Sequence, residues 1–229
     1  MSTQQTLTLE LPAQKHYGNW VRHPLVEGAS GRLALWMIKG GSLWLSSSEI
    51  AGKSHLIQAV FTGYSQIAFL PPFQAHLSSV AQLKAWLSTC EHHAYWVLDL
   101  PAGKLPMVVS YAVFHLIERA KDMNKALLIS WRCHEKEMQP PELSSRMLMM
   151  EKASVSAPIK DEDLKQVLES VLQNMQWDMK ETVLPTLLQH IPRNLPDLLN
   201  AIEKLDVYSR EKQVKMNGVL ALKVLGIHD

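Results

Sequence analysis

Four short runs of apolar residues, each separated from the next by a longer amphipathic segment, limit what this chain can fold into. The runs are S-L-W-L-S, Q-I-A-F-L, A-Y-W-V-L-D-L and K-A-L-L-I-S-W, at residues 42–46, 66–70, 94–100 and 125–131. Such runs are typical of strands that are buried on both faces of a parallel sheet. The segments between them have the character of helices, at residues 53–61, 78–87 and 106–120. This alternation predicts an α/β fold with a parallel five-stranded sheet, whose fifth strand is the short segment 152–157.

The pattern changes at Pro158, after which every periodic segment is helical. The predicted helices cover residues 161–175, a segment near 182–190, and residues 195–205 and 217–225. Asp161 or Asp163 can cap the first helix, and Pro185 suits the opening turn of the second, where a missing N–H matters least. We therefore divide the chain into a flexible N-terminal tail, an α/β core and a small all-helical C-terminal unit, at residues 1–15, 16–157 and 158–229.

Composition excludes several classes of protein. The chain has 229 residues and a net charge of +1, so no global field draws it to nucleic acid or to an acidic membrane. Its two cysteines, Cys90 and Cys133, are too few for a disulfide framework, which fits a reducing setting. The N-terminal residues have no basic start and no long apolar run, so we expect no signal peptide, and no stretch reaches the roughly 18 apolar residues of a membrane span. We expect a cytoplasmic protein.

The tripeptide Gly52-Lys53-Ser54 follows the first predicted strand and opens the next helix. This is the setting of a phosphate-binding loop, in which backbone N–H groups face the phosphates, the lysine contacts the β and γ phosphates, and the hydroxyl helps to hold Mg²⁺. Ser47 and Ile50 occupy two positions where such loops usually carry glycine. A β-branched side chain disfavours positive φ, so if the loop needs that conformation at position 50, Ile50 either strains the loop or reshapes it. The alternative interpretation is a helix start that binds no ligand.

An acidic residue ends the third predicted strand. Asp99 closes the run Y-W-V-L-D, and an aspartate at the carboxyl end of a buried strand can position Mg²⁺ in a P-loop ATPase. Its alternative role is that of a turn residue. The next residue is Leu100, which cannot accept a proton from an attacking water. We therefore expect no ATP hydrolysis by this chain alone.

Several of these stretches together resemble one family. E-I-A-G-K-S-H-L at residues 49–56 is similar to the phosphate loop of the Hda proteins, the DnaA-related AAA+ regulators of bacterial replication initiation. The similarity continues at V-L-D-L, L-L-I-S, P-E-L-S-S-R-M and P-I-K-D-E-D-L, which are residues 97–100, 127–130, 141–147 and 158–164. This resemblance covers about 220 residues. It implies a P-loop AAA+ core with a helical C-terminal lid, and ADP or ATP with Mg²⁺ as its ligand.

The resemblance also implies roles for single residues. Arg146 matches the arginine that, in this family, points toward nucleotide bound by a neighbouring AAA+ subunit; its alternative is a surface arginine beside a helix end. Ser130 falls at the sensor 1 position, where its hydroxyl would orient the γ-phosphate. The lid arginine that contacts nucleotide in the family is replaced here by Pro196. With Ile50 and Leu100, this makes three altered nucleotide-handling positions, so we expect nucleotide binding to be weak or absent.

The N-terminal residues contain a second family motif. Residues 4–9 read Q-Q-T-L-T-L, which resembles the hexapeptide by which Hda-like proteins dock on the sliding clamp of the DNA polymerase. Leu7 and Leu9 would enter an apolar pocket of the clamp while Gln4 forms a hydrogen bond at its edge. Ordering a short tail costs entropy, so the expected affinity is modest. The alternatives are a tail without a partner and an edge strand.

Together these features indicate a regulatory AAA+ adaptor that docks on the clamp and contacts DnaA, promoting its ATP hydrolysis and restraining re-initiation of replication. Two alternatives stay open, namely a P-loop ATPase in its own right and a nucleotide-independent clamp-binding scaffold. Homo-oligomerisation and direct contact with nucleic acid also stay open. A metal site at Cys90, His92 and His93 is not expected, because no second ligand pair completes it.

Overall fold

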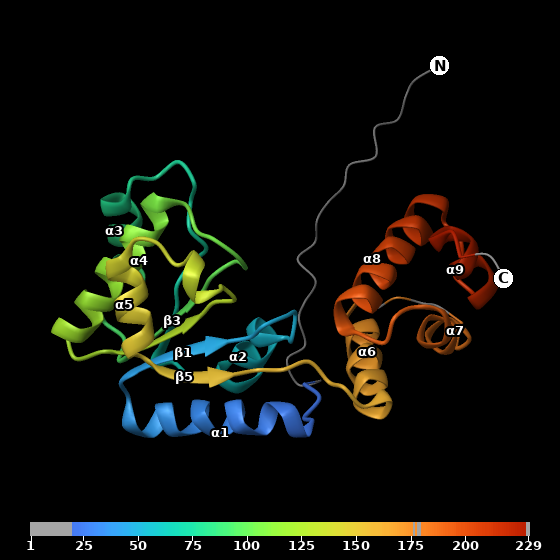
Figure 1. Cartoon of the computed structure of the whole chain (residues 1–229), viewed down its shortest axis with the longest axis horizontal. Helices are drawn as coiled ribbons and strands as arrows, with labels where there is room; N and C mark the ends of the chain where they lie inside the picture. Colours follow the sequence, from blue (N-terminus) through green and yellow to red (C-terminus); the bar gives the residue numbers. More distant parts are fainter. Residues whose placement is uncertain (1–19, 176, 178–179, 228–229) are drawn as a thin grey trace, which may run out of the picture.

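A five-stranded sheet forms the centre of the protein (Figure 1). The computed structural model describes residues 20–175, 177 and 180–227. The strands are β1 (Ser42–Ser46), β2 (Ile67–Phe69), β3 (Tyr95–Asp99), β4 (Ala126–Ser130) and β5 (Glu151–Ser154). They lie in the order β2-β3-β4-β1-β5, and every neighbouring pair is parallel. The predicted parallel sheet is therefore confirmed, with the last strand at 151–154 rather than at 152–157.

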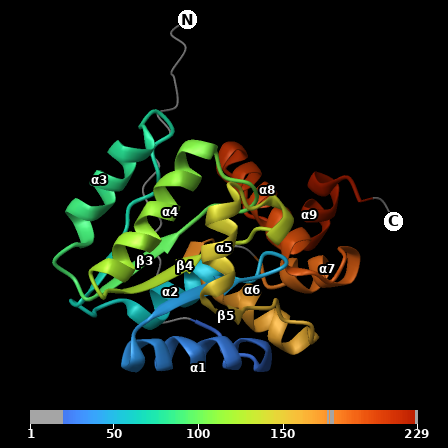
Figure 2. The ribbon, with the colours of Figure 1, turned by 60° about the vertical axis from the view of Figure 1, so that its left-hand side comes forward.

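Helices cover both faces of this sheet. On one face lie α1 (Pro24–Lys39) and α2 (Lys53–Phe61); on the other lie α3 (Ser79–Cys90), α4 (Met107–Asp122) and α5 (Pro141–Met149). Strand β1 shows why its residues are apolar at consecutive positions. Leu43 and Leu45 pack in the core with α1 and α2, whereas Trp44 between them packs in the core with α3, α4 and α5. Figure 2 shows α3 and α4 on the opposite side of the strands from α1.

Helices α1 and α5 were not among the predicted helices. Helix α1 begins with Pro24 at its first position and buries Val26, Ala29, Leu33 and Trp36 against the sheet. These four residues recur at the spacing of one helix face. Helix α5 lies just before β5 and carries the P-E-L-S-S-R-M segment. Both helices complete the two layers that cover the sheet.

The C-terminal helices form a separate group, the lid, beside the carboxyl ends of the strands (Figure 1). They are α6 (Asp161–Met175), α7 (Val183–His190), α8 (Leu195–Lys212) and α9 (Gly218–Leu225). All four predicted helices are present, and α8 continues beyond its predicted end at 205. The side chains of Asn194 and Asn217 cap α8 and α9, each accepting a backbone hydrogen bond of 2.9 Å. Within the described residues, no helix has the length and apolarity that crossing a membrane requires.

Candidate functional site

The loop between β1 and α2 makes the turn expected of a phosphate loop. Gly52 precedes α2 with φ of 73° and ψ of 25°, a left-handed conformation that glycine adopts without steric cost. Ile50 does not have a positive φ, because in the described part of the chain Asn124 and Gln213 are the residues other than glycine that do. The strain that a positive φ would impose on Ile50 is therefore not present in this loop. The turn is made at Gly52, and Ile50 keeps a conformation that its side chain tolerates.

Lys53, the first residue of α2, is held by a hydroxyl at one of the positions where glycine is usual. Its Nζ donates a hydrogen bond of 2.8 Å to Ser47 Oγ, which in turn donates one of 2.8 Å to the carbonyl oxygen of Glu49. Burial lowers the pKa of Lys53; the nearby Asp99 carboxylate opposes this change, and the Arg132 guanidinium adds to it. Lys53 is therefore a partly desolvated cation that lies near one acid and one other cation.

An open cavity of about 700 Å³ surrounds these groups, and we call it the phosphate cavity. Its lining comes from the phosphate loop and α2, from the segment after β2, and from the residues that follow β3 and β4, namely 49–55, 72–73, 99–102 and 132. The structure thus brings Gly52, Lys53, Ser54 and Asp99 together at one cavity. The Ser54 hydroxyl and the Asp99 carboxylate are oxygen ligands of the kind that Mg²⁺ takes, and Lys53 supplies charge for phosphates. The residues present therefore fit a magnesium–nucleotide complex.

Two residues at or just beyond the end of β4, Ser130 and Arg132, differ in whether they line this cavity. Ser130 is fully buried at the end of β4, and its hydroxyl has no hydrogen-bond partner among the described residues. It does not line the phosphate cavity, whereas Arg132, two residues later, does. No sequence motif marked Arg132, although it lies two residues beyond β4, the strand beside β1, at the carboxyl ends of the strands where ligands of parallel sheets gather. Leu100 is buried and carries no group that could activate water.

A second, apolar cavity of about 170 Å³ lies between the core and the lid, and we call it the apolar cavity. Trp20 and His23 line it from the core side, and Leu195 and Leu199 line it from α8. It shares residues 50–52 and His55 with the phosphate cavity, so the two are neighbours along the phosphate loop. The Trp20 and His55 rings stack with centroids 5.9 Å apart and an interplanar angle of 29°.

Two buried polar atoms belong to residues that line the apolar cavity. Neither Trp20 Nε1 nor His23 Nδ1 has a hydrogen-bond partner in the described part of the protein. Burial lowers the pKa of His23, and the Asp163 carboxylate opposes this change only in part. A neutral imidazole beside stacked rings in an apolar setting suits a flat heterocycle that carries hydrogen-bonding groups. No linear motif marks this cavity in the sequence, because its residues come from distant parts of the chain.

The lid contributes apolar surface to this region. Pro196 lies in the first turn of α8, between Leu195 and the Asp197 N–H that Asn194 caps. It therefore offers no donor for a phosphate. Among the described residues, those that line the phosphate cavity all belong to the core. The replacement implied at Pro196 thus leaves the phosphate cavity without a cation from the lid.

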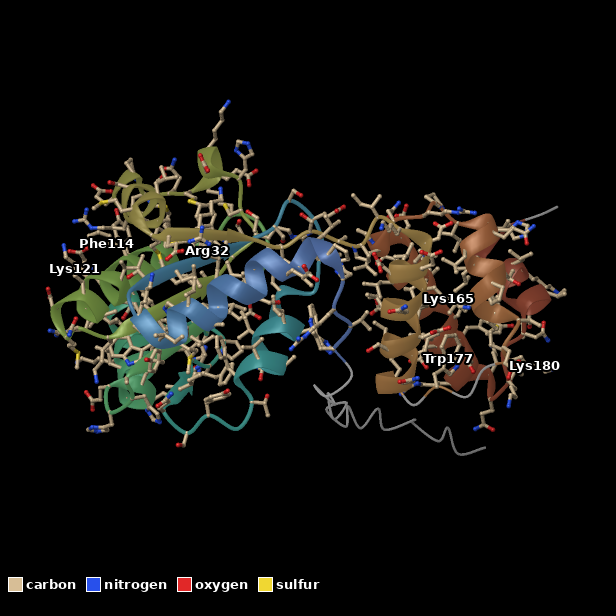
Figure 3. All side chains as sticks on the ribbon, turned by 90° about the horizontal axis from the view of Figure 1, so that it is seen from below. Arg32, Phe114, Lys121, Lys165, Trp177 and Lys180 are labelled. Atoms are coloured by element: carbon tan, nitrogen blue, oxygen red, sulfur yellow. The ribbon has the colours of Figure 1, made fainter. Side chains whose placement is uncertain are left out.

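Arg146 lies near the amino ends of the strands, at the end of the sheet opposite to the phosphate cavity. It belongs to α5, where its Nε donates a hydrogen bond to Glu118 and its guanidinium lies 5.9 Å from the centroid of the Phe114 ring. The cavity beside it, of about 530 Å³, includes the first residues of β1, β3 and β4, which mark the amino ends of the strands. Figure 3 shows Phe114 and Lys121 at the end of the core remote from the lid. Arg146 is therefore far from the chain's own phosphate cavity.

The remaining sequence motifs concern the N-terminal residues and the two cysteines. Gln4, Leu7 and Leu9, the predicted clamp motif, lie outside the described residues. Burial raises the pKa of Cys90 to about 12 and that of Cys133 to about 11, so neither is a reactive thiolate near neutral pH. Across residues 20–175, 177 and 180–227, no group of three or more histidine, cysteine, aspartate and glutamate side chains is arranged to hold a metal ion.

A phosphate loop after β1, an aspartate at the end of β3, a β2-β3-β4-β1-β5 sheet and a helical lid together define a P-loop protein of the AAA+ class. No protein-family model matches the chain, and no curated protein sequence matches it. Its fold, however, is shared with solved structures of other proteins.

Domain III of the Thermotoga maritima replication initiation protein DnaA is 16% identical, with a TM-score of 0.68, over 92% of this chain and 95% of that chain. AMPPCP-bound DnaA from Aquifex aeolicus is 13% identical, with a TM-score of 0.54, over 86% of this chain and 68% of that chain. The Thermotoga maritima RuvB Holliday junction branch migration motor is 12% identical, with a TM-score of 0.59, over 90% of this chain and 70% of that chain. The chain therefore has a DnaA-related AAA+ fold.

Proposed function

We propose that the chain is a regulatory AAA+ adaptor that resembles Hda. It binds ADP or ATP with Mg²⁺ between its core and lid, docks on the sliding clamp through Gln4, Leu7 and Leu9, and promotes ATP hydrolysis on DnaA through Arg146. The observation that carries this proposal is the position of Arg146 at the edge of the sheet opposite to the chain's own phosphate cavity.

The surroundings of Arg146 support an action on a nucleotide held by another subunit. Lys39, Lys121 and Lys125 line the same cavity, so the local field favours a polyanion. Glu118 and the Phe114 ring orient the guanidinium, which presents several donors in a fixed plane. An arginine supplied in trans stabilises charge that develops on a transferring phosphate. Arg146 cannot supply that charge to its own chain's site, which lies at the other ends of the strands.

The chain's own site is suited to holding a nucleotide rather than cleaving it. Lys53, Ser54 and Asp99 line one cavity and can engage phosphates and Mg²⁺. The apolar cavity beside them suits the base, since it offers stacked rings and two polar atoms that have no hydrogen-bond partner among the described residues. Leu100 stands where a proton acceptor for the attacking water would be needed. A bound nucleotide would thus act here as a structural ligand that joins the lid to the core.

A P-loop ATPase in its own right is the second candidate, because Lys53, Ser54 and Asp99 lie together in one cavity. Turnover of ATP by the purified chain, removed by Lys53→Ala, would favour this candidate over the adaptor. We expect no turnover above the background of a Lys53→Ala control.

Docking on the clamp is tested by capture of the full chain on immobilised sliding clamp. Replacing Gln4, Leu7 and Leu9 by alanine should abolish capture, because the apolar anchors and the edge hydrogen bond are lost. The matched control replaces Gln5, Thr6 and Thr8, which lie between the motif positions, and should be captured like the wild type. Equal capture of both variants would refute docking through this motif.

A further inference from the structure

Arg132 is a cation at the wall of the phosphate cavity. It lies two residues beyond β4 and is half-buried. Its backbone carbonyl accepts a hydrogen bond of 2.7 Å from the Gly103 N–H, and the Trp131 indole N–H donates one of 3.0 Å to the Gly103 carbonyl. These two bonds fix the backbone of Arg132 against the loop after β3. Its side chain makes no hydrogen bond or ion pair within the described part of the chain.

The position of Arg132 within the site indicates which part of a nucleotide it would contact. Residues 50–52 and His55 line both cavities, and they lie where the base and the first phosphates of a bound nucleotide would meet. Asp99 and Arg132, from the ends of β3 and β4, line the phosphate cavity but not the apolar cavity. A phosphate chain that starts at the apolar cavity therefore reaches Arg132 with its last group.

The charges that line the phosphate cavity also favour a contact between Arg132 and a phosphate. Lys53 and Arg132 are its cations, and they are close enough for Arg132 to lower the pKa of Lys53. Two like charges in a partly buried cavity repel each other, and an anion between them removes that repulsion. The acids at the same wall are Asp99, which a magnesium ion would engage, and Glu49, which is exposed. Since no described lid residue lines this cavity, Arg132 is the second cation available to a phosphate chain.

We propose that Arg132 binds the terminal phosphate of a nucleoside triphosphate and makes the site distinguish a triphosphate from a diphosphate. This inference rests on the proposed nucleotide binding. The guanidinium would form charge-assisted hydrogen bonds with γ-phosphate oxygens, and these bonds are among the strong ones in proteins. A diphosphate ends short of Arg132 and leaves it unpaired. The core thus carries, in cis, a sensor for the γ-phosphate that the lid lacks.

The test is isothermal titration of the full chain with ATP and with ADP, each in the presence of Mg²⁺. Losing a charge-assisted hydrogen bond corresponds to a weakening of about 10- to 100-fold. Arg132→Ala should weaken ATP binding by this factor and ADP binding by less than about threefold. Arg132→Lys, which keeps the charge but not the planar fork, should bind ATP with intermediate affinity. The matched control is Arg119→Ala, since Arg119 is exposed on α4 and does not line the phosphate cavity.

The outcomes separate this inference from the function on which it rests. If the wild type binds neither nucleotide, the proposed nucleotide binding fails and the inference fails with it. If the wild type binds both, and Arg132→Ala weakens neither or weakens both equally, only the role of Arg132 is overturned. The ratio of ATP to ADP affinity is the decisive quantity, because a merely structural change would lower both affinities together. An unchanged melting temperature of the ligand-free variant confirms that it folds.

Discussion

Replacing Gly52 by alanine tests whether the left-handed turn before α2 holds the phosphate loop in place. Gly52 has a φ of 73°, and an L-residue with a Cβ atom in this region costs about 1–2 kcal/mol. The new methyl group would lie 3.4 Å from the Trp20 ring, which is close to ordinary van der Waals contact. The contact therefore adds little, and the backbone strain decides the magnitude. We expect Gly52→Ala to lower the free energy of unfolding by about 1–2 kcal/mol.

The assay is urea-induced unfolding followed by circular dichroism, with the free energy obtained by linear extrapolation. Two other glycines separate the contribution of backbone strain from that of the Trp20 contact and from the general effect of adding a methyl group. Gly63 has a φ of 93° with nothing near its Cβ position, so Gly63→Ala carries the strain without the Trp20 contact. Gly31 lies inside α1 in open space, so Gly31→Ala should stabilise the protein by about 0.5–1 kcal/mol. A Gly52→Ala variant as stable as the wild type would refute the reasoning, because the turn would then not require glycine.

Three further predictions concern other parts of the molecule. Since burial lowers the pKa of His23, the unfolded chain binds this proton more tightly than the folded protein does. The free energy of unfolding should therefore be constant above the usual pKa of 6.5 and fall as the pH drops below it. Denaturant unfolding between pH 7 and 5 should show that this free energy depends less steeply on pH in His23→Gln than in the wild type. Phe61→Ala removes a fully buried ring and should cost about 3–5 kcal/mol in urea unfolding, whereas Tyr64→Ala, at a half-exposed side chain, should change stability by less than about 0.5 kcal/mol. Cys90, buried and with its pKa raised to about 12, should react with a maleimide reagent at pH 7.5 only after unfolding, and rapid labelling of the native protein would contradict its position.

The sheet was predictable because burial on both faces leaves a strong local signal. Trp44, flanked by leucines, is one such position, since a strand covered on a single face would alternate apolar with polar residues. Helix α1 leaves a weaker signal. Gly28 and Gly31 lower its intrinsic propensity, and the exposed side chains of Leu35 and Ile38 interrupt the amphipathic pattern. Its helical state depends on packing against the sheet, which a local pattern does not report.

In the candidate site, too, some residues are marked by a local sequence motif and others are brought together only by the fold. Gly52, Lys53 and Ser54 are adjacent in sequence, so their motif could be read directly, and Asp99 ends a recognisable strand. The apolar cavity brings together residues from the start of the core, the phosphate loop and the lid, and no linear motif marks such a set. Arg132 was missed because the strand-end position was assigned to Ser130, which faces the interior of the core. The φ of Ile50 depends on the path of the whole loop and not on its own identity.

The central claim, that Arg146 acts on nucleotide held by DnaA, is tested most directly by the rate of ATP hydrolysis on ATP-loaded DnaA in the presence of clamp and this chain. Arg146→Ala should reduce the stimulated rate to that of DnaA alone, because the charge supplied in trans is lost. The matched control is Arg32→Ala, which breaks another exposed arginine–glutamate pair, with Glu151, and should stimulate like the wild type. Full stimulation by Arg146→Ala, or none by the wild type, would contradict the proposed function.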